Sequence, residues 1–182
     1  MTAITACLWA KTTFAASHLI HHLSYAVSGS HNAFLTGYEG NGNIFFYIFR
    51  QRITTSIPSS EMSDGAWHHW CFAWNNGVGA WSVFRDGMPA ARGTGFQTSR
   101  SIPPNGTWIV GQDQDSVGGG FDVYQAYVGD ITSVNVWNTN NVNVTAMANC
   151  GENLGGNVIS WDTVTKESHE MSTYGEVLCR YK

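Results

Sequence analysis

Apolar and polar residues alternate along most of this chain, which is the pattern of β-strands with one buried face. In the segment 69–74, Trp70, Phe72 and Trp74 fall on one face and Cys71 falls on the other. Aromatic residues and isoleucine, which favour strands, are frequent in 43–50. The pattern predicts strands at 4–9, 43–50, 69–74, 81–85, 107–110, 131–137 and 157–161.

Turn and helix signals complete the prediction of the fold. Asp86-Gly87, directly after the strand 81–85, is a residue pair typical of a two-residue β-hairpin. One helix is expected near 141–149, with Asn140 as its N-cap. Many short strands, glycine turns and a single short helix predict an all-β, two-sheet antiparallel sandwich of the jelly-roll type. No repeat or linker interrupts the pattern, so we expect residues 1–182 to form a single domain.

The charge balance narrows the classes of partner. The formal net charge is −4, and no basic stripe is visible. A nucleic-acid partner is therefore not expected, because phosphates attract basic surfaces. No apolar run reaches the length of a membrane-spanning helix, so we expect no membrane span in this chain.

The chain has four cysteines, none of them in a CxxC pair. An even count in a lysine-poor chain favours two disulfides in a secreted, extracellular protein, with three possible connectivities. The alternative is a set of buried thiols in a cytosolic protein. Two Asn-X-Thr triplets, at Asn105 and Asn143, are candidate glycosylation sites. The four cysteines are Cys7, Cys71, Cys150 and Cys179.

Residues 111–125, which we call the acidic loop, contain three aspartates and three consecutive glycines. Asp113 and Asp115 are two residues apart, so on an extended segment they project to the same side. The glycines let the chain fold back and bring Asp122 and Gln125 toward the same ion. Calcium takes about six to eight oxygen ligands, and the loop offers many. The alternative is a solvated acidic turn.

The acidic loop and the residues after it, 128–137 (VGDITSVNVW), resemble the most characteristic stretch of the pentraxin family. The segment 69–74 (HWCFAW) is similar to the family pattern His-x-Cys-x-Ser/Thr-Trp, with alanine at the hydroxyl position. Residues 24–26 (SYA) and 156–161 (GNVISW) also match, and the matches run in family order. The resemblance implies a jelly roll with a double calcium site on one face and a helix on the other.

The resemblance also implies particular residue roles. It pairs Cys7 with Cys71, which leaves Cys150 and Cys179 to pair with each other. It implies that one or two Ca²⁺ ions bind to oxygens of the acidic loop and of one residue outside it. The implied metal ligands are Asn32, Asp113, the main-chain carbonyl of Gln114, Asp115, Asp122 and Gln125.

Several positions depart from the family pattern. His31 stands where the family has aspartate, and Asp113 and Asp122 stand where it has glutamate. Three anionic ligands then face two calcium ions, so we expect weaker binding, since ligand charge tunes calcium affinity. His31 is interpreted either as a position where a calcium ligand has been lost or as a ligand for a softer metal such as zinc. Gly37 stands where a phosphocholine pocket needs an apolar side chain, so phosphocholine is not the expected ligand.

Other candidate groups have simpler interpretations. His18, His21 and His22 are expected to be a solvated patch, with a transition-metal site as the alternative. His68 and His69 are expected to pack beside the disulfide. Strand tryptophans offer stacking surfaces for sugars, but we expect them in the core.

Three classes of function remain. The favoured one is a secreted, calcium-dependent, lectin-like domain without catalytic activity, which binds a carbohydrate or an anionic, phosphorylated ligand through calcium. The alternative is an adhesion or assembly module of a larger extracellular protein, with weak or structural calcium only. In both, homo-oligomers or an assembly partner are expected. A glycosidase would need two carboxylates with separated pKa values, and Asp113 and Asp115 are a conceivable pair.

Overall fold

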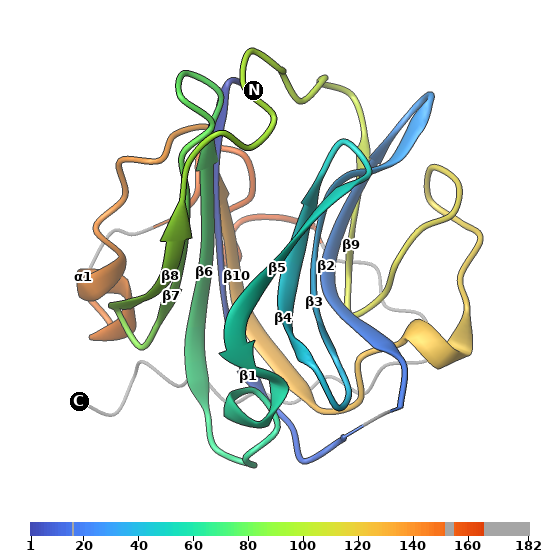
Figure 1. Ribbon diagram of the computed structural model, residues 1–182, viewed down its shortest axis with the longest axis vertical. Coiled ribbons are helices and arrows are strands. Elements are labelled where there is room, and N and C mark those ends of the chain that lie inside the picture. The colour runs from blue at the N-terminus through green and yellow to red at the C-terminus, as the bar shows by residue number, and fades with distance from the viewer. Residues whose placement is uncertain (16, 152–154, 166–182) are drawn as a thin grey trace.

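The computed structural model describes residues 1–15, 17–151 and 155–165 and consists of two antiparallel sheets packed face to face (Figure 1). The first sheet has the order β10 (Asp130–Trp137), β1 (Ala3–Lys11), β6 (His68–Asn75), β7 (Trp81–Arg85) and β8 (Met88–Gly93). The second has the order β5 (Gln51–Pro58), β4 (Asn43–Ile48), β3 (Ser30–Glu39), β2 (Leu19–Val27) and β9 (Thr107–Val110). The predicted two-sheet sandwich is confirmed.

The space between the sheets holds one apolar core. In β6, Trp70, Phe72 and Trp74 point into this core, whereas Cys71 belongs to a smaller cluster on the outer face. The alternation read from the sequence is therefore correct for this strand. Burial of such large aromatic side chains supplies about 1.5–3 kcal/mol each.

The smaller cluster lies beneath α1 (Val144–Ala148), which covers the outer face of the first sheet (Figure 1). The helix rests on the β7–β8 turn, where Thr145 Oγ1 donates to the Gly87 carbonyl at 2.9 Å. Gly87 has φ +80°, and a Cβ there would lie 2.9 Å from Thr145 Cα. Asn143 caps the helix, accepting from Ala146 N, so the expected cap at Asn140 is wrong. The segment before Asn143 stays extended because the helix forms only where it can pack on the turn.

The strand boundaries differ from the prediction in two places. β4 ends at Ile48, and Phe49 and Arg50 form a two-residue turn with φ +49° and +62°. The expected strand at 157–161 is reduced to one bridge between Val136 and Ile159.

The prediction contained no strand at β2, β3 or β5. β2 is buried at every residue except Leu19 although it includes His21 and His22, and six of the ten residues of β3 are buried. Neither strand therefore shows the alternation of apolar and polar residues that marks a strand with one buried face.

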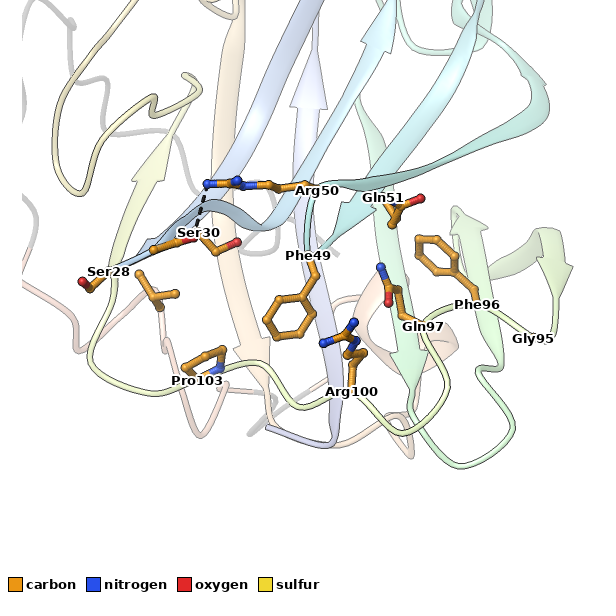
Figure 2. Close-up of a pocket in the computed structure, with 12 residues that line it drawn as sticks. Ser28, Ser30, Phe49, Arg50, Gln51, Gly95, Phe96, Gln97, Arg100 and Pro103 are labelled. Carbon is orange, nitrogen blue, oxygen red and sulfur yellow. Dashed lines mark hydrogen bonds between the residues drawn. The ribbon is translucent and has the colours of Figure 1, made fainter.

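Short connections close the two ends of the sandwich. Two 3₁₀ turns are present. η1 (Ser59–Glu61) follows β5, and η2 (Val123–Gln125) forms the end of the acidic loop. At one end, a cleft of about 760 Å³ opens between the β2–β3 turn, the β4–β5 turn and the segment 94–106 (Figure 2). Within the described residues, no helix has the length and apolar character needed to cross a membrane.

Candidate metal centre

The acidic loop joins β9 of the second sheet to β10 of the first. It lies beside β2 and β9, on the side of the sandwich opposite α1 (Figure 1). The expected placement of the loop on one face and the helix on the other is therefore observed. The loop follows β9 directly, so the sheet fixes its beginning.

Gln114 anchors the loop to the second sheet. Its side chain is fully buried, and Nε2 donates to Ser24 Oγ at 3.0 Å and to the Thr107 carbonyl at 3.0 Å. The Gly118 N–H donates to Gln114 Oε1 at 2.9 Å. Because the side chain is engaged inside the protein, the main-chain carbonyl is the group that Gln114 could offer an ion, and this is the role that the resemblance implies for it.

Asp113 is the most buried acidic side chain of the loop, with 4% of its surface exposed. Its Oδ1 accepts from Gln114 N at 2.7 Å, and no described lysine or arginine forms an ion pair with it. Burial is the main cause that raises the pKa of Asp113, and the nearby Asp115 charge adds to it. A buried carboxylate without a cation is costly, so this position favours a positive ion.

Asn32, at the start of β3, faces the same carboxylate. When the amide is oriented by its hydrogen-bond partners, its nitrogen donates to Asp113 Oδ1 at 3.0 Å and to the His31 carbonyl at 3.2 Å. Asn32 of β3 and Asp113 of the acidic loop therefore lie in direct contact, although the two are far apart in the sequence.

The last two predicted ligands lie at η2. Gln125 Oε1 is buried and meets no donor among the described residues. Asp122 is exposed and caps η2, because its Oδ1 accepts from Tyr124 N at 2.9 Å. The other end of the loop is tied to the same residue, since Gln112 Nε2 donates to the Asp122 carbonyl at 2.9 Å. The fold-back expected from the glycines is therefore present.

The carboxylates themselves are not fully gathered. In the described part of the chain, three His, Cys, Asp or Glu side chains have ligand atoms that all lie within 4.8 Å of one another only at Cys7, His69 and Cys71. Cys7 and Cys71 form a disulfide there, so their sulfurs are not thiolate ligands. The acidic loop thus presents a buried half at Asp113 and an exposed half at Asp115 and Asp122.

The structure also shows the surroundings of His31 and Gly37, two positions that depart from the family pattern. His31 Nδ1 lies 3.5 Å from Arg50 Nη2, so a guanidinium occupies one side of this ring. Gly37 faces Phe45 on β4, and a Cβ at Gly37 would lie 2.8 Å from the Phe45 ring. Phe45 therefore fills the space that a larger side chain at Gly37 would need.

The histidines of β2 are not a solvated patch, so that prediction is wrong for two of the three. His22 is fully buried, stacks on Tyr38 and contacts Phe72, and neither ring nitrogen has a hydrogen-bond partner among the described residues. Burial lowers the pKa of His22 to about 3 and that of His21 to about 4. Consecutive side chains of a strand point to opposite faces, and β2 is buried on both faces here, which the sequence did not reveal. The pairing of β2 with β3 also shifts register between His21 and Leu23.

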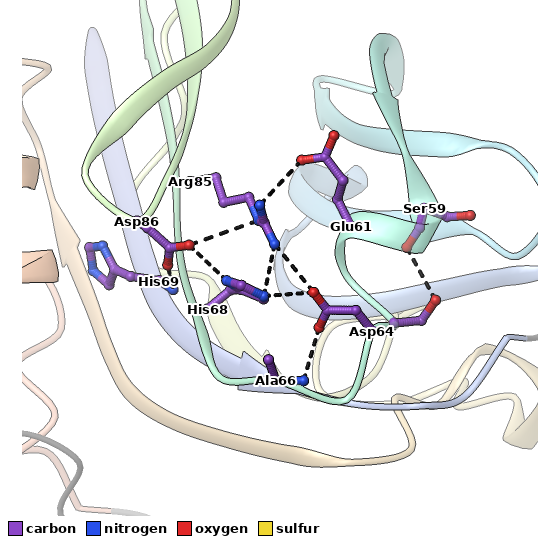
Figure 3. A network of polar contacts seen from close by, with 9 residues as sticks. Ser59, Glu61, Asp64, Ala66, His68, His69, Arg85 and Asp86 are labelled. Atoms are coloured by element: carbon purple, nitrogen blue, oxygen red, sulfur yellow. Dashed lines mark hydrogen bonds and ion pairs between the residues drawn. The ribbon is translucent and has the colours of Figure 1, made fainter.

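A second polar cluster joins the β6–β7 region to the segment after η1 (Figure 3). His68 lies between two carboxylates, with Nδ1 2.7 Å from Asp86 Oδ2 and Nε2 2.9 Å from Asp64 Oδ2. Arg85 reaches Asp64 at 3.3 Å and Glu61 at 3.7 Å. Burial acts to raise the pKa of Asp64, but hydrogen bonds and the charges of His68 and Arg85 lower it. We call these five side chains the paired network.

The disulfide predicted between Cys7 and Cys71 is present and links β1 to β6. His69 packs against it, with ring nitrogens 3.8 Å from Cys71 Sγ, as expected. Cys150 is disulfide-bonded as well, and its expected partner Cys179 lies outside the described residues.

Comparison with known proteins agrees with this architecture. Residues 1–177 match the model of the pentaxin family. Mouse neuronal pentraxin-2 is 36% identical over 161 residues, which cover 87% of this chain and 37% of the relative. The human neuronal pentraxin receptor is 35% identical over 162 residues, covering 88% of this chain and 32% of the relative. The chain thus spans about a third of the length of these relatives.

A solved structure gives the same result in three dimensions. A heptameric pentraxin from Limulus polyphemus, described as similar to serum amyloid P, superposes with a TM-score of 0.77 at 26% identity, covering 90% of this chain and 78% of the other. Sheet order, disulfide and acidic loop all accord with the resemblance read from the sequence. The chain belongs to the pentraxin family.

Proposed function

We propose that this chain is a secreted, calcium-dependent binding domain that recognises a carbohydrate or an anionic, phosphorylated ligand through calcium on the acidic loop. Bound calcium would supply a hard positive charge to which ligand oxygens coordinate. The residues that would hold it are Asn32, Asp113, the Gln114 carbonyl, Asp115, Asp122 and Gln125. The disulfide between Cys7 and Cys71 supports an oxidising, extracellular setting.

One observation carries the proposal. Asp113 is buried without an ion pair to any described lysine or arginine, and Gln125 Oε1 is buried without a described donor. Buried acceptors are satisfied in folded proteins almost without exception. A cation satisfies acceptors of this kind, and it also neutralises the buried Asp113 charge.

Two features favour one tightly held ion over two. Asp115 and Asp122 are exposed, so ordering them around an ion costs side-chain entropy. Three carboxylates also leave two calcium ions, with four positive charges, under-neutralised. We therefore propose one site at the Asn32–Asp113 end of the loop and a weaker second site at Asp122.

Calcium titration by calorimetry tests the proposal. Wild type is expected to bind calcium, and Asp115→Ala to lose the heat of the weaker site and at least tenfold in affinity at the other. Asp64→Asn is the matched control, because it removes a carboxylate from the paired network and should leave the titration unchanged. Normal calcium binding by Asp115→Ala would refute the site.

Absence of catalysis forms part of the proposal. The raised pKa of Asp113 is a direction that a general acid also needs. The donor-free oxygen of Gln125 separates the two interpretations, since a general acid does not require it. Glycan binding that disappears on chelation without turnover supports the binding domain. Glycan cleavage in EDTA would support an enzyme.

A second candidate is an adhesion or assembly module with weak or structural calcium. It is favoured by the incomplete gathering of the three carboxylates, and the relatives are about three times longer than this chain. Homo-oligomers are proposed in both cases. Light scattering with and without calcium separates them, since an assembly module would change its mass without any glycan affinity.

Both candidate glycosylation sites are compatible with modification. Asn105 and Asn143 are exposed. Asn143 uses its side-chain oxygen to cap α1, which leaves the amide nitrogen free to carry a glycan. Loss of mass on glycosidase treatment of protein from a secretory host would identify the sites.

A further inference from the structure

The cleft at the end of the sandwich combines positive charge with an absence of negative charge (Figure 2). Arg50 and Arg100 line it, and none of the residues that line it is acidic. This is unusual in a chain whose net charge is −4. The cleft is a region separate from the oxygens proposed to hold calcium, although Arg50 N donates to the Asn32 carbonyl at 2.9 Å.

The two guanidinium groups have spare hydrogen-bonding capacity. Arg50 Nη2 donates to the Gly29 carbonyl at 3.2 Å and approaches a His31 nitrogen. Among the described residues, neither Arg50 nor Arg100 forms an ion pair, and the Arg100 side chain makes no hydrogen bond. A guanidinium carries five N–H donors, so several remain for a ligand. By contrast, Arg52 and Arg85 both meet carboxylates.

Of the eight described non-glycine residues with positive φ, three line the cleft: Phe49, Arg50 and Gln97. The β4–β5 turn has two residues, and both have positive φ, a conformation for which Asn-Gly or Asp-Gly is preferred. The β7–β8 turn of this chain uses that chemistry, with Asp86 at φ +52° and Gly87 at φ +80°. The β4–β5 turn instead holds Phe49 and Arg50, at φ +49° and +62°.

The strain extends to the opposite wall of the cleft. Gln97 also has a positive φ, +50°, and Figure 2 shows Phe49, Gln97 and Arg100 directed into the space between the three segments. A left-handed conformation costs a residue with a side chain about 1–2 kcal/mol. Costs of this kind gather at sites that bind ligands.

The remaining lining residues define the chemistry of the ligand. Phe49 and Phe96 pack partly on the core and leave ring surface toward the cleft, which suits the apolar face of a sugar ring. Ser28, Gln51 and Gln97 add neutral hydrogen-bonding groups. Arginine binds tetrahedral and planar oxyanions through paired N–H groups.

We propose that this cleft binds a sugar carrying a sulfate or phosphate ester, with the oxyanion held by Arg100 and the ring against Phe49, while Arg50 adds positive charge to the cleft. Calcium takes no part in this contact. The site is therefore distinct from the calcium-dependent one, and the two succeed or fail independently.

Titration with glucose 6-sulfate and with glucose 6-phosphate, followed by NMR in EDTA at low salt, tests the proposal. At least one ester is expected to shift resonances of the cleft, and the arm that binds identifies the oxyanion. Neutral glucose should bind at least tenfold more weakly. Arg100→Ala should weaken the bound ester about tenfold, as expected for a lost charged hydrogen bond. Arg92→Ala is the matched control, an exposed β8 arginine outside the cleft, and should change nothing.

A double variant separates binding from folding. Phe49→Asn with Arg50→Gly installs the preferred turn residues but removes the Phe49 ring from the edge of the core. The two effects offset each other, so the melting temperature should stay within about 5 °C of wild type while ester binding is lost. A folded variant without affinity shows that the two side chains serve the ligand. Ester binding that survives in this variant, or no binding of either ester to wild type, overturns the proposal.

Discussion

The paired network and the acidic loop hold their carboxylates in opposite ways. In the network, Asp64 and Asp86 are exposed, and each meets His68 or Arg85 within 3.3 Å. In the loop, Asp113 is buried and lies against the Asn32 amide. The exposed carboxylates thus have ion-pair partners, whereas the buried Asp113 forms no ion pair with a described lysine or arginine.

The same contrast separates the histidines. His68 is held between two carboxylates, while His22 is sealed among aromatic rings with no described hydrogen-bond partner. Buried polar atoms without a described hydrogen-bond partner include ring nitrogens of His21 and His22 on β2 and Oε1 of Gln125 in the acidic loop. We expect pH and metal to change the stability of the protein strongly through β2 and the acidic loop, and only weakly through the paired network.

Acid should produce the largest effect. His22 and His69 have pKa values lowered to about 3 and 4, in both cases mainly by burial. Between these values and about 6.5, the unfolded chain binds more protons than the folded one, so stability is complete above pH 6.5 and is lost as the pH falls. At pH 5 the loss is about 2 kcal/mol for each histidine, measurable by urea unfolding across pH.

Replacement of His22 measures how much this residue contributes to the pH dependence of stability. His22→Phe keeps a ring among Tyr38, Phe72 and Tyr127 and removes two unsatisfied nitrogens. Its stability is expected to depend less on pH than that of wild type and to rise by about 1 kcal/mol at pH 7. An unchanged slope between pH 7 and pH 5 would contradict the assigned burial.

Calcium should stabilise the protein through Asp113. At calcium concentrations 100 times above Kd the gain is about 2.7 kcal/mol, or about 5–10 °C for a domain of this size. Asp113→Asn removes the buried charge, so it should melt higher than wild type in EDTA and gain little from calcium. If this variant melts lower than wild type in EDTA, the unpaired-charge interpretation is wrong.

Gln125→Met tests the donor-free acceptor. The substitution keeps the length of the side chain and deletes the buried oxygen, so metal-free stability should hold or improve. Calcium affinity should fall about tenfold, equivalent to about 1.4 kcal/mol, as measured by calorimetry. Equal affinity in the variant would remove Gln125 from the ligand set.

The paired network should show the smallest effect. Exposed ion pairs contribute about 0–1 kcal/mol and are screened by salt. Arg85→Met is therefore expected to lower stability by less than about 1 kcal/mol, with the difference shrinking at high salt. A salt-independent loss of several kcal/mol would mean that the network is not a surface feature.

Much of this protein could be predicted from sequence because its signals are local. The alternation in β6, the Asp86-Gly87 turn and the order of residues in the acidic loop each depend on near neighbours in the chain. The same dependence on local signals explains which strands were not predicted. β2 and β3 have buried residues on both faces, some of them polar, and this removes the alternation that marks a strand.

The resemblance to pentraxins added what local signals could not supply, namely the pairing of Cys7 with Cys71 across two strands. It did not show that Gln114 would be anchored to Ser24, nor that His22 would turn inward. These contacts join residues far apart in the chain, so the packing of the two sheets decides them.

The sequence by itself determined the class of fold, the family and the residues available to a metal, because each follows from residue type and order. Only the tertiary structure decided which of these residues meet. Asp113 and Asn32 are 81 positions apart in number, and their approach depends on β3, β2 and β9 lying side by side in one sheet. The cleft with Arg50 and Arg100 likewise exists only where separate turns converge, since a single segment cannot surround a ligand.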